Sequence, residues 1–413
     1  MKTGLCFGAI CMVAVMAAPA AAQNSDVRVR VDTEAIREAA EEIRSAMREA
    51  FGPDFRLELH RDVRSATRDV AEVIADITRN LSVDLRDFSR DFSRSFGRDF
   101  GREIEAWFDD GSGSWQRNFP ASQTDTERRT FAIGATGEFE LENLSGDIRI
   151  VAGSGRDLVI EITRRARGRR DDDARTGLSR VRVETTHRGD RVVARTVYPS
   201  GRQSDYSVSV DYVVTAPAGT RVTARTVSGN VTVSGLTGEL SLHSTSGDIT
   251  ATDVTRLQMA KTVSGDVIVR NSGSSGLLQA ATMSGDVTAT DVKADRIDFG
   301  SVSGSVTARN VTSGDVSMKS TSGDLLFDGN LAADGRYAFT SHSGTVRLSL
   351  DGRTGFSFEA STFSGSVRTD IPLQVTSVGT SRRPNQSLRG TFGDGSARVT
   401  ATAFSGNVVV TRR

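Results

Sequence analysis

The chain has 413 residues, of which 37% are hydrophobic and 25% charged, so it is long enough for more than one domain and too apolar to be disordered throughout. Lys and Arg number 52, and Asp and Glu also number 52, so the positive and negative charges balance. A balanced chain has no long-range field that would attract nucleic acid or an anionic membrane surface. We therefore expect no nucleic acid partner.

Residues 1–22 have the order of a secretory signal peptide. A lysine is followed by an apolar run, by Pro19 and by three alanines before Gln23. The apolar run is shorter than the ~20 residues that a membrane-spanning helix needs. Both cysteines, Cys6 and Cys11, lie in this segment, so the mature chain is expected to have no thiol or disulfide. The segment predicts export to the periplasm, the outer surface or the medium.

Residues 23–110 are expected to form an amphipathic α-helical region. Over 34–50, apolar residues recur at spacings of three and four between Glu and Arg residues. Over 86–108, tandem tetrapeptides such as R-D-F-S place one large apolar residue at every fourth position. The resulting stripe consists of Phe88, Phe92, Phe96, Phe100, Ile104 and Phe108.

This stripe winds around its helix, because four residues advance ~400° along an α-helix. A straight partner could not cover it. We interpret the stripe as a packing surface either for the helix expected over 34–50 or for a second subunit, and the second case would be self-association. Contact with a membrane surface is the less favoured alternative, because acidic residues accompany nearly every arginine and leave little net attraction to anionic headgroups.

Two segments separate the helices from the repeats. Residues 111–129 combine Gly, Ser, Pro and polar residues without periodicity, which predicts a linker. Residues 130–217 contain several alternating segments, which predict the strands of a β entry cap. Within this cap, 164–175 is highly charged and is expected to be a solvated loop.

Residues 218–413 contain an internal repeat marked by Ser-Gly pairs. Successive glycines are 18 to 21 residues apart, and the last follows after about two further periods. These glycines are Gly229, Gly247, Gly265, Gly285, Gly304, Gly323, Gly344, Gly365 and Gly406.

Each repeat has a strand pattern on both sides of its glycine. Apolar residues alternate with polar ones before the glycine, as at Leu278 and Ala280, and after it, as at Val287 and Ala289. Stacking such strand pairs ~4.8 Å apart would build one continuous core. The sequence predicts a mainly β fold, a parallel β-solenoid of two-strand coils with about 19 residues per coil, preceded by the α-helical region.

The residues around the glycine fit a tight corner. Glycine reaches positive φ, Ser and Asp side chains bond to nearby backbone amides, and a Ser or Thr three residues before the glycine would form an inward hydroxyl column. The acids after the glycine would stack in a second column. Its members are Asp248, Asp266, Asp286 and Asp324. We interpret them as turn caps. A Ca²⁺ column is the less favoured alternative, because the G-G-x-G-x-D repeat of calcium-binding β-rolls is absent.

Three motifs carry a family resemblance. They are L-E-N-L-S-G-D-I-R-I from Leu141, V-T-A-P-A-G from Val214, and the tandem T-V-S-G-N-V-T-V, T-S-G-D-I-T-A and T-V-S-G-D-V-I-V. Over about 130–413 the chain resembles the bacterial "putative adhesin" β-strand-repeat family, domain of unknown function 4097. The resemblance implies a repetitive β fold and a location in the cell envelope.

The sequence contains no arrangement typical of catalysis. H-E-x-x-H and G-K-S/T motifs are absent, and the carboxylates do not gather outside the repeats as a polysaccharide hydrolase would need. We expect a non-enzymatic protein with no cofactor, an adhesin-like scaffold that binds a protein or polymer partner. The alternative is an envelope structural or stress-related protein whose Phe-rich helix mediates oligomerisation or membrane contact.

Overall fold

The computed structural model describes residues 119–199, 205–380 and 386–413. The predicted signal segment 1–22 and helical region 23–110, including the Phe stripe, lie outside these residues. The described part is mainly β, with 23 strands and the single helix α5 (Asp171–Arg180). No helix within these ranges is long and apolar enough to cross a membrane.

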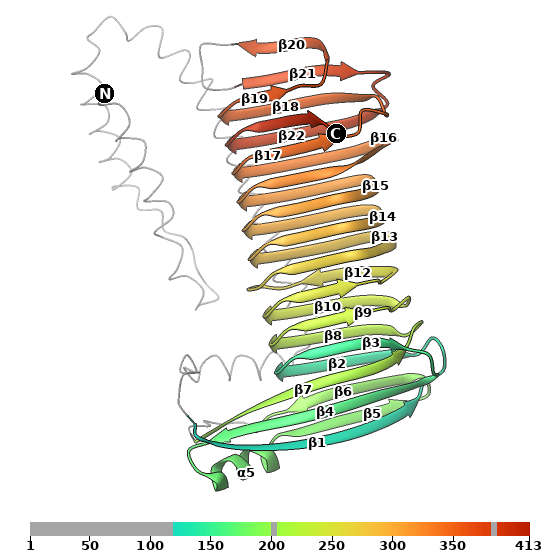
Figure 1. Cartoon of the computed structure of the whole chain (residues 1–413), viewed down its shortest axis with the longest axis vertical. Helices are drawn as coiled ribbons and strands as arrows, with labels where there is room; N and C mark the ends of the chain where they lie inside the picture. The colour runs from blue at the N-terminus through green and yellow to red at the C-terminus, as the bar shows by residue number, and fades with distance from the viewer. Residues whose placement is uncertain (1–118, 200–204, 381–385) are drawn as a thin grey trace, which may run out of the picture. The chain divides into compact units, whose positions relative to one another are not determined.

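Most strands form a solenoid-like stack of two parallel columns that meet at the Ser-Gly corners (Figure 1). Strands β13 to β16 pass through both columns. The column before the corner contains, in spatial order, β2 (Glu138–Ser145), β8 (Arg221–Ser228), β10 (Glu239–Ser246), β12 (Arg256–Lys261), β13 (Val267–Ser284), β14 (Val287–Ser303), β15 (Val306–Ser322), β16 (Leu325–Ser343), β22 (Ala397–Ser405) and β18 (Phe356–Ser364). The column after it contains β3 (Ile148–Gly153), β9 (Val231–Ser234), β11 (Ile249–Thr252), β13 to β16, β17 (Val346–Leu350), β23 (Val408–Arg412) and β19 (Val367–Thr369).

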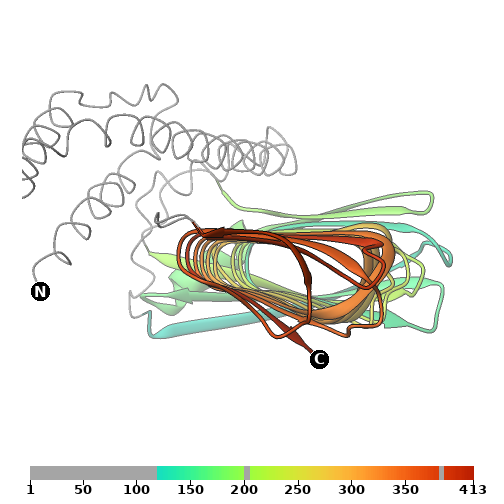
Figure 2. The same ribbon diagram turned by 90° about the horizontal axis from the view of Figure 1, so that it is seen from above.

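Alternate residues of both columns point inward and form one core along the stack. Leu278 and Ala280 before a corner, and Val287 and Ala289 after it, are all fully buried. Seen along the stack, successive coils superimpose on one flattened loop (Figure 2). A coil could not bury these side chains alone, so each coil depends on its neighbours.

The N-terminal end of the stack is closed by antiparallel strands and α5. The strand β6 pairs with β2, and β7 pairs with β3, so the β2–β3 coil lies between these cap strands and the β8–β9 coil. The cap contains β1 (Ala121–Ala132), β4 (Asp157–Gly168), β5 (Arg182–Arg188), β6 (Arg191–Val197) and β7 (Tyr206–Pro217).

Two sequence expectations were wrong in this cap. The predicted linker 111–129 includes most of β1. This strand pairs with β4 along its whole length, although most of its residues are polar. The segment 164–175, expected to be a loop, contains the end of β4 and the start of α5. There Ala166 is fully buried, and Arg164 donates one hydrogen bond to the Val181 carbonyl (3.1 Å) and pairs with Asp125. Arg164 and Arg165 therefore pair with acids on neighbouring strands, Asp125 and Asp211, while most of the other charged side chains of the segment are exposed.

The C-terminal end departs from sequence order. The chain passes from β17 to the β18–β19 coil and then forms a hairpin of β20 (Gln374–Thr380) and β21 (Gln386–Phe392), of which β21 pairs with β18. It then returns, and β22 and β23 lie between the β16–β17 coil and the β18–β19 coil. The last coil in the sequence is thus the second last in space.

Candidate functional site

The nine glycines singled out in the sequence lie in one column, joined by Gly146 at its N-terminal end. A Cβ atom built on any of the nine would lie 1.9 to 2.4 Å from the carbonyl oxygen of the preceding glycine in the column. Real Cβ atoms do not approach an oxygen so closely, so a side chain would force two coils apart. In spatial order the column is Gly146, Gly229, Gly247, Gly265, Gly285, Gly304, Gly323, Gly344, Gly406 and Gly365.

The acids after the glycines connect each coil to the next. Asp248 Oδ1 accepts a hydrogen bond from the backbone N–H of Asp266 (2.8 Å), and Asp266 Oδ1 accepts one from Asp286 (2.8 Å). Asp286 and Asp324 accept equivalent bonds from Ser305 and Thr345, both 2.8 Å. Each of the four carboxylates singled out in the sequence thus caps a backbone amide of the adjacent coil.

One observation favours capping over the Ca²⁺ alternative. At the same position, the neutral side chains of Asn230 and Asn407 accept equivalent bonds of 2.9 Å, so the position does not need a charge. Within the described ranges, no three His, Cys, Asp or Glu side chains gather as a metal site. Partial burial raises the pKa of Asp324, but the Thr345 N–H and the Arg347 guanidinium outweigh this effect and hold the pKa below its ordinary value.

The residues three before the glycines form an inward hydroxyl column. Thr262 Oγ1 donates to the Gly247 carbonyl at 2.9 Å, and Thr282 Oγ1 donates to the Gly265 carbonyl at 2.9 Å. Ser244, Ser301, Ser320, Ser341 and Thr362 make the same bond to the glycine of the adjacent coil. The buried glycine carbonyls thereby obtain partners, which a buried polar group needs.

Sequence reasoning missed a second corner six residues after the glycine. There Asp253, Asn271, Asp291 and Asn310 adopt left-handed backbone with φ between 44° and 55°. Asn271 and Asn310 donate side-chain bonds to Asp253 and Asp291, respectively. The recurrence of Asp or Asn at this position could have indicated the corner, because these two residues tolerate the left-handed conformation better than most others.

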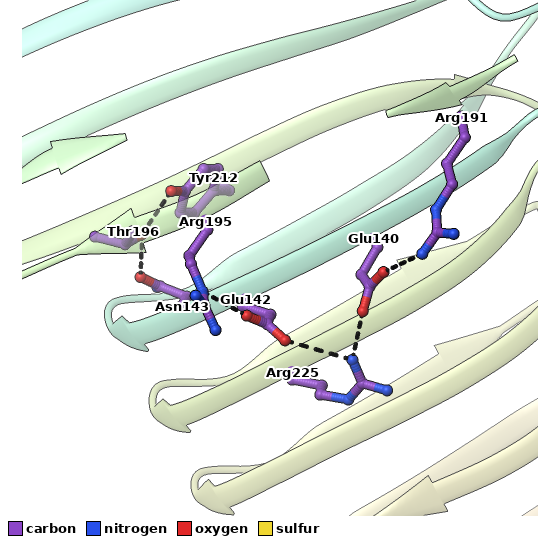
Figure 3. A network of polar contacts seen from close by, with 8 residues as sticks. All are labelled: Glu140, Glu142, Asn143, Arg191, Arg195, Thr196, Tyr212 and Arg225. Carbon is purple, nitrogen blue, oxygen red and sulfur yellow. Dashed lines mark hydrogen bonds and ion pairs between the residues drawn. The ribbon is translucent and has the colours of Figure 1, made fainter. Parts of the chain in front are cut away.

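A charged network joins the cap to the first coils (Figure 3). Glu140 on β2 accepts hydrogen bonds from Arg191 on β6 (2.8 Å) and from Arg225 on β8 (2.7 Å). Glu142 on β2 pairs with Arg195 on β6 at 2.7 Å and with Arg225 at 3.6 Å. Burial raises the pKa of Glu140, but the two arginine bonds outweigh it and lower the pKa below its ordinary value. The network ties three adjacent strands together.

A buried polar chain lies beside this network (Figure 3). Thr196 Oγ1 donates to Asn143 Oδ1 (2.9 Å) and lies 2.6 Å from the Tyr212 hydroxyl. Asn143 Nδ2 donates to the carbonyls of Gly146 and Val210. Burial raises the pKa of Tyr212, so its hydroxyl stays protonated. These contacts are structural, since every group bonds to another part of the cap or the first coil.

His243 is the most buried histidine of the described residues, with 3% of its surface exposed. Burial lowers its pKa to about 3, with further lowering by Arg225 and Lys261. Its Nε2 lies 3.1 Å from Ser241 Oγ. Because solvent does not reach the ring, this Ser-His pair cannot act on a dissolved substrate.

The described surface has two shallow hollows, on either side of a bulge at Ser275 and Gly276. There the pairing of β13 with β14 shifts register between Ser274 and Leu277. The first hollow is lined mainly by Glu239, Arg256, Gln258, Met259, Leu277 and Gln279. The second includes Asn271, Asp291, Lys293, Asp295, Thr312 and Ser313. Both offer amide and charged groups, and Leu277 adds an apolar surface that is 36% exposed.

Comparison with protein families decides the classification. The model described as Toastrack DUF4097 matches residues 136–411. The chain belongs to this family. No curated protein matches the chain.

Three solved structures are similar over 70% of this chain. A "putative adhesin" from Parabacteroides merdae has 12% identity, 96% coverage of its own chain and a TM-score of 0.36. A "putative adhesin" from Parabacteroides distasonis has 11% identity, 97% coverage and a TM-score of 0.31. A "putative cell adhesion protein" from Clostridium sporogenes has 10% identity, 100% coverage and a TM-score of 0.18.

Proposed function

We propose that this Toastrack protein is an exported, non-enzymatic, adhesin-like scaffold that binds a protein or polymer partner at the cell envelope. Residues 1–22 support export, because they have the order of a cleavable signal peptide. The corner acids support a non-enzymatic role, because Asp248, Asp266, Asp286 and Asp324 are all engaged in capping. The glycines act as structural corners that set the spacing of the displayed side chains.

The bulge at Ser275 and Gly276 is the observation that carries the proposal. It interrupts a regular stack and places an exposed leucine, Leu277, in the lining of the first hollow, and both hollows are rich in hydrogen-bonding groups. Apolar contact combined with a few polar groups is typical of a binding site. Shallow, open hollows fit an extended partner that lies across several coils. We therefore place the partner-binding surface here.

A retention experiment tests this surface. The full chain is immobilised and exposed to envelope extract, in parallel with the variants Leu277→Asp and Val375→Asp. Val375 is a matched control, because it is also exposed, at 51%, but lies on β20 and not beside the hollows. We expect Leu277→Asp to abolish retention of the partner and Val375→Asp to preserve it. Equal retention by both variants would contradict the assignment.

The alternative function is an envelope structural or stress-related protein that uses the Phe-rich segment 86–108 for oligomerisation or membrane contact. Its support is the spacing of six large apolar residues, from Phe88 to Phe108. Cell fractionation separates the two proposals. A surface-exposed, protease-sensitive product favours the adhesin-like scaffold. A membrane-associated product that is released by deletion of 82–108 favours the alternative.

A further inference from the structure

The C-terminal strands form a module that is closed on itself. Strand β18 pairs with β21 on one side and β22 on the other, while β19 pairs with β23. We call β18 to β23 the C-terminal module. Only the segment 351–355, between β17 and β18, connects it covalently to the rest of the stack. Gly352 in this connection has a φ of 65°.

The module meets the stack along one interface, where β16 pairs with β22 and β17 pairs with β23. We call this interface the seam. At the seam, the corner hydroxyl is absent, because Ala403 stands where the other coils have Ser or Thr, or Asn143 in the β2–β3 coil. The cap that the corner acids form in other coils is absent as well. Among the described residues, the Thr345 side chain accepts no hydrogen bond from the backbone amide of Asn407. The backbone bonds do not distinguish the seam, because Gly344 N donates to Ser405 O at 3.2 Å and Gly406 N, inside the module, donates to Ser364 O at 3.1 Å.

The next interface within the module has both corner bonds. Thr362 Oγ1 donates to the Gly406 carbonyl at 2.8 Å, and Ser366 N donates to Asn407 Oδ1 at 2.9 Å. The β22–β23 coil is therefore tied more firmly at the corner to the coil that precedes it in sequence, β18–β19, than to the coil across the seam. If the stack opens locally, the seam is where we expect it to part.

The other contacts at the seam could form equally well with the C-terminal module of a second copy of the chain. His342 stacks on Phe404 with ring centroids 4.8 Å apart, and Arg413 pairs with Asp328 at 3.2 Å. The inward residues Val399 and Ala401 are small and pair with the large Tyr337 and Phe339. The β16–β17 edge therefore accepts only a strand that carries small inward residues, an aromatic ring and a matching corner. The C-terminal module of another copy has all three.

We infer that the seam is a joint for exchange between copies: the C-terminal module of one molecule pairs with the β16–β17 edge of a second. Opening the seam exposes two rows of unpaired backbone groups, one on β16–β17 and one on β22–β23, and such edges pair with whatever strand fits them. A single connecting segment makes exchange of a whole module a low-cost route to dimers. The partner is a second copy of this chain, and the interface is independent of the Phe stripe.

Two populations of the full chain with different affinity tags test the proposal, and both carry Phe92→Ser, Phe96→Ser and Phe100→Ser so that the Phe stripe does not itself join copies. After joint incubation below the melting temperature, we expect them to co-purify as a mixed complex. In the variant Thr340→Cys/Thr402→Cys, oxidation joins β16 to β22 across the seam, since these residues are register partners. Neighbouring strands are close enough for a disulfide. Oxidation before the two populations are mixed should reduce the mixed complex to background, and reduction of the disulfide should restore it.

The matched control is Ser361→Cys/Thr402→Cys, which joins β18 to β22 inside the module. This disulfide should leave exchange intact, because the module moves as a unit. A third variant, Ala403→Ser, adds the missing hydroxyl and should slow exchange roughly fivefold, the factor of one net hydrogen bond. Absence of a mixed complex from the chain with an unmodified seam would overturn the proposal. So would an oxidised seam variant that still forms it, or a control disulfide that blocks it.

Discussion

Replacement of Gly265 is the most direct test of the corner. Its φ is +141°, and a Cβ atom there would lie 2.4 Å from the carbonyl oxygen of Gly247 and 3.0 Å from Asp248 Oδ1. The first of these neighbours is backbone, so only a separation of two coils could relieve the clash. The variant Gly265→Val adds two methyl groups to this clash. In addition, β-branched residues do not adopt the backbone conformation found at position 265.

The expected cost can be estimated from these contacts. A non-glycine residue held in a sparsely populated backbone region costs about 1 to 3 kcal/mol. Displacement of the adjacent coil would also weaken bonds such as the one from Thr282 to the Gly265 carbonyl. We expect Gly265→Val to reduce the free energy of unfolding by about 3 to 5 kcal/mol. Asp266→Asn should change it by less than about 0.5 kcal/mol, because Asn230 already caps the same position in another coil.

Urea unfolding monitored by the β signal in circular dichroism measures both variants. Gly276→Ala is the matched glycine control, because a Cβ atom at this position has no neighbour within 4 Å. It should unfold like the native chain. If Gly265→Val and Asp266→Asn lose equal stability, or if Gly276→Ala loses as much as Gly265→Val, the steric explanation of the corner is wrong.

Three further predictions concern protonation, metal binding and the Phe stripe. The pKa of His243 is about 3 in the folded chain, below the ordinary 6.5, so the unfolded chain binds more protons between these values. Stability is complete above pH 6.5 and should fall by about 2 to 3 kcal/mol near pH 4.5, a loss that urea unfolding should not find in His243→Gln. Added Ca²⁺ should leave the melting temperature unchanged, because the corner carboxylates already accept backbone bonds; a rise of many degrees would revive the cation alternative. Replacement of Phe92, Phe96 and Phe100 by Ser should change the oligomeric state or helix content without changing the β signal; unchanged light scattering and circular dichroism with loss of liposome binding would favour the lipid interface.

The corners could be predicted from the sequence because they depend on residues that are close together in the chain. A glycine, an acid after it and a hydroxyl three residues before it recur at nearly constant spacing, and each has a short-range reason to be there. The cap was less accessible because its strands depend on distant partners. The polar residues of β1 show no apolar alternation, and β4 is defined by its pairing with β1 and β7. No periodicity within 164–175 could indicate those partners.

Coil order was inaccessible for a different reason. Gly344 and Gly365 are 21 residues apart, as are Gly323 and Gly344, so the spacing predicts direct stacking of successive coils. The structure instead places Gly406 between Gly344 and Gly365. The aromatic residues before these glycines show the same order, since Phe404 stacks between His342 and Phe363. Equal spacing fixes the shape of a coil but not the identity of its neighbour.

The two ends of the stack therefore differ in how they accommodate a coil out of sequence order. At the N-terminal end, the β2–β3 coil is held between cap and stack by the Glu140 and Glu142 ion pairs and by the buried bonds of Asn143. At the C-terminal end, the β22–β23 coil meets the stack without either corner bond. Since the backbone pairing is parallel and in register at both ends, the side chains decide which end stays closed. This asymmetry is why exchange between copies is expected at the seam and not at the cap.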